Sequence, residues 1–152
     1  MSPPPVDPEE LAIYAFDILG DRAPDHVDYQ AHLKFINDFG QSHYLNTLEN
    51  IFAAHSDAEL AKWLLHATGL NGIDLEGDGN FDNMALATSF IQANSGNRVK
   101  AMLDIAHQLA YNLTDELGGI GYAYTDKLHA GYQYAKDPAS TSPVYYISTQ
   151  HI

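Results

Sequence analysis

Apolar residues recur at helical spacing along most of this chain. Counting from Leu11, apolar side chains return three, four, seven and eight positions later, which places them on one face of an α-helix. Asp7 and Pro8 precede this run as an N-cap and a first-turn proline, and Gly20 follows it as a stop signal. The pattern predicts a first helix of about three turns that begins at Pro8.

The same periodicity predicts further helices. The second ends at Gly40, Ser42 is the expected cap of the third, and Ser56 with Glu59 forms a capping box for the fourth. The most regular pattern starts at Val99, whereas the last segment is crowded with tyrosines. The predicted segments are 25–39, 42–52, 56–67, roughly 82–94, 99–113 and 120–135.

The predicted fold class is all-α, a single compact bundle of about six to seven helices with short loops and an extended C-terminal tail. A chain of 152 residues with 45% apolar residues is long enough to bury one core. We expect residues 1–7 to be a disordered proline-rich lead and residues 8–136 to be the helical domain. Residues 137–152 are predicted to be a tail or linker, with an extended strand as the alternative.

Charge narrows the classes of partner. The formal net charge is −13, so the surface repels nucleic-acid phosphates and attracts divalent cations, calcium above all. The chain has no cysteine, which excludes disulfides and thiolate chemistry. Residues 1–5 lack the basic start and apolar stretch of a secretory signal, and no apolar run reaches about 18 residues, so we expect neither an N-terminal export signal nor membrane insertion.

One polar loop has the alternating oxygen side chains of a calcium-binding loop. Gly79 stands at the position where such loops turn sharply, and Ala85 stands where an EF-hand carries its bidentate carboxylate. An acidic turn that caps the following helix is the alternative interpretation. The predicted calcium ligands are Asp74, Glu76, Asp78, Asn80 and Asp82.

The sequence predicts no catalytic site. No His-Glu-x-x-His helical pair and no Gly-x-Ser-x-Gly nucleophile elbow occurs, although the chain has eight histidines. Two alternatives stay open. The histidines and tyrosines also fit a protein that binds haem or another small molecule, and an enzyme assembled from scattered residues such as His66, His107 and Glu76 is the third hypothesis.

Aromatic and basic residues supply the candidates for ligand binding. Tyrosines at the C-terminal end, together with Trp63 and Tyr111, offer rings on which the apolar faces of sugars can stack. Two neighbouring cations are candidates for the anionic groups of lipopolysaccharide. The candidate ligand-binding residues are Arg98, Lys100, Tyr122 and Tyr124.

Three stretches carry a resemblance to a known family. Residues 14–29 contain Leu-Gly-Asp-Arg-Ala-Pro-Asp, with Val27 in place of a glycine, and residues 93–110 contain Asn-Ser-Gly-Asn-Arg. Residues 124–135 follow in the same order. Together they resemble the helical N-terminal, anchoring domains of type I secreted, RTX-type S-layer and surface proteins of bacteria.

The resemblance implies attachment rather than catalysis. Such domains anchor calcium-dependent proteins to the cell surface, often through lipopolysaccharide, or pack against neighbouring copies. We therefore expect a non-catalytic surface-attachment or self-assembly module that is exported by type I secretion. Its expected partners are surface glycan, other copies of itself or neighbouring domains of a longer chain.

Overall fold

The computed structural model describes residues 3–73, 75, 77, 79, 82–111 and 120–145. Over these residues the chain forms seven α-helices, one 3-10 helix and two short strands. The elements are α1 (Pro8–Gly20), β1 (Arg22–Ala23), α2 (His26–Phe39), α3 (Gln41–Ile51), α4 (Asp57–Thr68), the 3-10 helix (Leu70–Gly72), α5 (Met84–Ala93), α6 (Arg98–Ala110), α7 (Ile120–Lys136) and β2 (Val144–Tyr145). The all-α fold class predicted from the sequence is confirmed.

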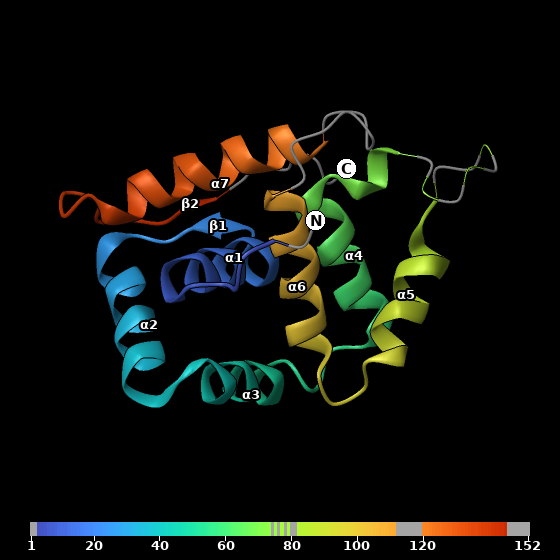
Figure 1. Cartoon of the computed structure of the whole chain (residues 1–152), viewed down its shortest axis with the longest axis horizontal. Helices are drawn as coiled ribbons and strands as arrows, with labels where there is room; N and C mark the ends of the chain where they lie inside the picture. Colours follow the sequence, from blue (N-terminus) through green and yellow to red (C-terminus); the bar gives the residue numbers. More distant parts are fainter. Residues whose placement is uncertain are drawn as a thin grey trace.

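Helix α1 lies at the centre of the fold, with α7 above it and α3 below it in Figure 1. It contacts α2, α4, α6 and α7. All of residues 11–18 are buried, including the polar Asp17. The sequence pattern predicted a single apolar face, but the helix is apolar on nearly all sides and the other helices surround it.

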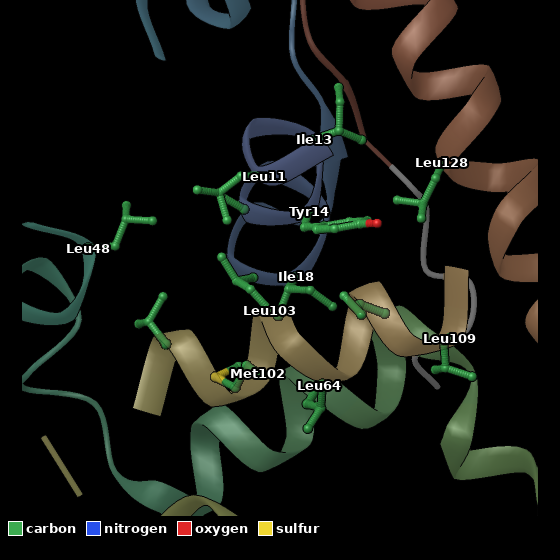
Figure 2. Packing of buried hydrophobic residues seen from close by; sticks show 14 of the residues in the cluster. Leu11, Ile13, Tyr14, Ile18, Leu48, Leu64, Met102, Leu103, Leu109 and Leu128 are labelled. Atoms are coloured by element: carbon green, nitrogen blue, oxygen red, sulfur yellow. The ribbon is translucent and has the colours of Figure 1, made fainter. Parts of the chain in front are cut away.

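One continuous apolar core joins the helices around α1. Figure 2 shows side chains of this core converging from several helices, including Leu11 of α1, Leu48 of α3, Leu64 of α4, Met102 of α6 and Leu128 of α7. Burying one such side chain contributes about 1.5–3 kcal/mol. The helices are therefore held mainly by this shared core.

Side-chain caps fix the starts of two helices as the sequence predicted. The Asp7 carboxylate accepts from the Glu10 amide at 2.8 Å, and Glu10 accepts from the Asp7 amide at 3.0 Å. A second capping box joins Ser56 and Glu59. The prediction of Ser42 as a cap was wrong, because α3 begins one residue earlier and Gly40 occupies its N-cap without a side-chain bond.

The N-terminal lead, for which disorder was expected over residues 1–7, contacts the helices through Pro4 and Val6. The Pro4 carbonyl accepts a hydrogen bond from His107 Nε2 at 2.6 Å, and the Val6 carbonyl accepts one from the Gln41 amide at 2.9 Å. The Val6 side chain packs against the core. These contacts supply the backbone partners that a free proline-rich segment would lack.

The described part of the C-terminal tail also returns to the helical domain. Val144 and Tyr145 form β2, which pairs antiparallel with Ala23 and Arg22 of β1. The Ser140 hydroxyl accepts from the His26 amide at 2.9 Å and so holds the tail at the start of α2. The strand considered for this tail thus has its partner within the same chain.

The sequence predicted no membrane insertion, and the length and apolar character of the helices can be compared with this expectation. Within the residues described, none of them combines the length and the apolar character needed to span a lipid bilayer.

Candidate functional site

A cavity of about 440 Å³ opens where the start of α1 meets the end of α6 and the middle of α7. Its volume falls within the range of about 300–1,000 Å³ that is usual for small-molecule sites. Its lining combines apolar side chains with three carboxylates and three tyrosines. We take this cavity as the candidate functional site.

Apolar side chains from three helices form the inner part of the cavity. Ile13 and Tyr14 come from α1, Ala110 from α6 and Leu128 from α7. Figure 2 shows Ile13, Tyr14 and Leu128 close together, with the Tyr14 hydroxyl directed toward the side on which Leu128 lies. This part of the cavity suits the apolar face of a ligand.

Carboxylates at the start of α1 orient the tyrosines of the rim. One Glu9 oxygen accepts from the Tyr132 hydroxyl at 2.7 Å and from the Tyr29 hydroxyl at 3.2 Å. Glu10 accepts from the Tyr111 hydroxyl. These bonds fix two aromatic rings at the rim before any ligand arrives.

The Tyr14 hydroxyl is held by a histidine of α6. His107 Nε2 lies 2.6 Å from the Pro4 carbonyl, which can only accept, so we assign the ring proton to Nε2. Nδ1 then accepts from the Tyr14 hydroxyl at 2.7 Å. Burial raises the pKa of Tyr14 above its ordinary value, and the charges of Glu10 and Asp7 act in the same direction.

The electrostatics of the cavity are those of neutral phenols beside carboxylates. The hydrogen bond from Tyr111 to Glu10 raises the pKa of Tyr111 to about 12, and the hydrogen bond from Tyr132 to Glu9 raises the pKa of Tyr132 to about 12. Both phenols therefore keep their protons at physiological pH. With Asp7 also in the lining, the cavity favours neutral or cationic ligands over anions.

The structure gives Arg98, a predicted ligand residue, an internal environment. Its side chain is 12% exposed. The guanidinium donates to Asp57 and to the His55 carbonyl, both at 2.9 Å, and to the Phe52 carbonyl at 3.2 Å. Arg98 thus links the start of α6 to the junction between α3 and α4.

The other predicted ligand residues lie apart from the cavity. Lys100 is exposed and pairs with Asp104 at 2.9 Å, and Tyr122 is 48% exposed on α7. Tyr124 is buried and donates to Asp17 at 2.7 Å. Trp63 lines a separate hollow of about 260 Å³, whereas Tyr111 does line the candidate cavity.

Most of the predicted calcium loop lies outside the described residues, including Asp74, Glu76, Asp78 and Asn80. Asp82 is described, and its carboxylate accepts from the Met84 amide at 3.0 Å at the start of α5. Gly77 and Gly79 have φ angles of 70° and 82°, the left-handed conformation that favours glycine. Calcium binding at this loop stays a prediction.

Elsewhere in the described chain, no group of three or more His, Asp or Glu side chains is arranged to hold a metal ion. The structure places the two histidines of the enzyme hypothesis in different environments. His66 lines the hollow beside Trp63, and His107 is bound to Tyr14 and Pro4. Glu76 lies outside the described residues.

Sequence reasoning missed two groups of polar residues. It did not single out Glu9, Glu10 or His129 as ligand residues, yet they line the cavity beside Tyr132, which is one of the C-terminal tyrosines considered for sugar stacking. It also missed the buried Asp17, which lies 2.8 Å from Lys127. The one available signal was an aspartate within the apolar run of the first helix.

Comparisons with family models, with curated proteins and with solved structures find no match to this chain. The fold and the site therefore define its class: an all-α domain with an acidic, tyrosine-lined cavity at the start of its central helix.

Proposed function

We propose that this protein is a non-catalytic binding module that takes a neutral or amino sugar into the cavity at the start of α1. By doing so it attaches to a surface that carries glycan. One observation carries the proposal: Tyr111 and Tyr132 are held at the rim of a cavity of about 440 Å³ by hydrogen bonds to Glu10 and Glu9.

Sugars need two kinds of contact, and the cavity provides both. The C–H faces of a sugar ring stack on aromatic side chains, and its hydroxyls donate to carboxylates. Tyr14 and Leu128 offer apolar surface inside, while Glu9 and Glu10 offer acceptors at the rim. Because the hydrogen bonds already orient the rings, binding costs little additional side-chain entropy.

The charge of the cavity narrows the proposed glycan. Asp7, Glu9 and Glu10 disfavour phosphorylated or acidic sugars. The anionic groups of lipopolysaccharide, for which Arg98 and Lys100 were considered, are therefore unfavourable ligands for this cavity. A neutral hexose or an amino sugar meets no such repulsion. If lipopolysaccharide is the partner, we propose that its uncharged portion is recognised.

The resemblance of residues 14–29, 93–110 and 124–135 to anchoring domains supports the wider role of surface attachment. On that basis we also propose export by type I secretion and association with other copies or with neighbouring domains. Stabilisation by calcium at residues 74–82 belongs to the same proposal.

Saturation-transfer NMR with the purified chain tests the sugar proposal. The probes are N-acetylglucosamine, rhamnose and glucosamine, with glucuronic acid as the acidic counterpart. We expect signals from the first three and none from glucuronic acid. Equal binding of glucuronic acid, or no binding of any probe, would contradict the proposal.

Paired variants locate the binding site. Tyr132→Ala removes a ring at the rim, and we expect sugar binding to fall at least tenfold. Tyr122→Ala removes an exposed tyrosine of the same helix outside the cavity, and binding should be retained. Loss of binding in Tyr122→Ala alone would instead assign the sugar to the tyrosine predicted from the sequence.

A further inference from the structure

Arg22 is a half-buried cation that forms no ion pair within the described chain. None of the ion pairs found there involves Arg22, although the sequence has 20 acidic residues against 7 basic ones. Its Nε atom is buried and has no hydrogen-bond partner. A buried donor without a partner is unfavourable, so this group calls for an explanation.

The surroundings hold the Arg22 side chain in place without neutralising it. Its backbone is fixed by the pairing of β1 with Tyr145, and its guanidinium carbon lies 5.2 Å from the centre of the Phe16 ring. A Cβ added at Gly20 would lie 3.0 Å from Nη1 of Arg22. The absence of a side chain at Gly20 thus leaves the space that the guanidinium occupies.

This guanidinium lines a hollow of about 210 Å³ whose walls are otherwise mainly apolar. Phe16, Leu48 and Phe52 contribute side chains from α1, from α3 and from the residue that follows α3, and Ile51 at its edge is 63% exposed. The hollow is distinct from the tyrosine-lined cavity, with which it shares no lining residue.

His32 is the second polar group in the lining. Its ring lies 4.4 Å from the Phe16 ring, and its Nδ1 lies 2.7 Å from the Tyr44 hydroxyl. When Tyr44 donates to Nδ1, the proton of the neutral imidazole is on Nε2, which makes His32 a second donor beside Arg22.

We propose that this hollow binds a small amphiphilic carboxylate, with its charged group against Arg22 and its aliphatic or aromatic body among Phe16, Leu48 and Phe52. The planar guanidinium matches a carboxylate in shape and charge, and the ligand would supply a counterion for Arg22. Inorganic phosphate fits less well, because apolar walls cannot replace its hydration. The site is independent of the proposed sugar cavity.

Isothermal titration of the full chain with hexanoate tests this assignment, with hexan-1-ol as the uncharged counterpart and inorganic phosphate as the anion without an apolar body. We expect hexanoate to bind at least tenfold more tightly than either of the other probes. Equal binding of hexan-1-ol would remove the role of Arg22, and equal binding of phosphate would remove the role of the apolar walls. Absence of hexanoate binding would overturn the proposal.

Two variants test the geometry. Arg22→Met keeps the stem of the side chain and removes its charge, so hexanoate binding should weaken at least tenfold while hexan-1-ol binding is unchanged. Gly20→Ala places a methyl group 3.0 Å from Nη1 of Arg22, so the guanidinium must shift by a few tenths of an ångström, and hexanoate binding should weaken. Tyr132→Ala lies in the other cavity and should have no effect. Unchanged hexanoate affinity in a folded Arg22→Met or Gly20→Ala protein would overturn the proposal.

Discussion

The carboxylate of Asp17 lies 2.8 Å from the ammonium group of Lys127, and this pair joins the central helix to α7. Asp17 is fully buried, whereas the Lys127 side chain is 22% exposed. Lys127 also donates to the Ala67 carbonyl at 2.7 Å, which adds α4 to the network. Burial raises the pKa of Asp17, and the Lys127 charge and the Tyr124 hydroxyl partly oppose that rise.

Lys127→Met should lower the free energy of unfolding by about 3–5 kcal/mol, because it leaves a buried carboxylate without its counterion. The double variant Asp17→Leu with Lys127→Met should recover most of this loss, since it removes both buried charges. Urea unfolding of the two variants measures the difference. A double variant no more stable than Lys127→Met would contradict a role for this ion pair.

Arg98→Lys should destabilise the protein by about 2 kcal/mol. A lysine keeps the charge but cannot donate to Asp57, His55 and Phe52 together. The matched control is Lys100→Met two residues later, whose exposed pair with Asp104 should contribute no more than about 0.5 kcal/mol. Similar losses in both variants would show that Arg98 has no special structural role.

Asn83→Ala should cost about 2–3 kcal/mol of unfolding free energy. The buried Asn83 amide donates to the carbonyls of Leu70 and Ile73, both at 2.8 Å, and so joins the two ends of the acidic loop. Its removal leaves acceptors unsatisfied. Asn97→Ala is the control, because Asn97 is exposed and makes no side-chain capping bond. Thermal and urea unfolding provide the comparison.

Local sequence patterns predicted the helices because helical periodicity and capping are local properties. Asp7, Ser56 and their partners lie three residues apart, so their roles can be recognised without the fold. The two-residue strand at Arg22 could not be recognised, since its partner strand, Val144–Tyr145, lies at the far end of the described chain. The central position of α1 depends likewise on packing by the other helices.

The candidate site was harder to predict because its parts are distant in sequence. Tyr132 lines the cavity beside Glu9, and Tyr111 beside Glu10, across more than a hundred residues in each case. Arg98 illustrates the converse problem. In the sequence Arg98 is a cation with no evident partner, but in the fold it has five protein oxygens within 3.5 Å, and residue type alone cannot distinguish these situations.

Removal of calcium should lower the melting temperature by several degrees if residues 74–82 bind the ion as predicted, because a ligand that binds only the folded state stabilises it. Differential scanning calorimetry with added calcium and with a chelator provides the test. Asp78→Asn should abolish the difference, whereas Asp104→Asn, on the surface of α6, should retain it. An identical melting temperature with and without chelator would contradict stabilisation of the fold by calcium.

The His32 environment gives the stability of the protein a pH dependence with a definite sign. Burial lowers the pKa of His32 below its ordinary value of about 6.5, Asp28 opposes this shift, and Arg22 adds to it. The unfolded chain therefore takes up a proton before the folded chain does, so stability present above pH 6.5 is lost as the pH falls through the folded-state pKa. The raised pKa of Asp17 acts in the opposite direction, because the folded chain then takes up a proton at Asp17 before the unfolded chain does, and the free energy of unfolding increases on acidification.

His32→Gln should make the loss of unfolding free energy between pH 7 and pH 5 smaller than in the unmodified protein. The contribution of Asp17 is the same in both proteins. Urea unfolding at a series of pH values measures the two slopes, and equal slopes would show that His32 titrates alike in the folded and unfolded states.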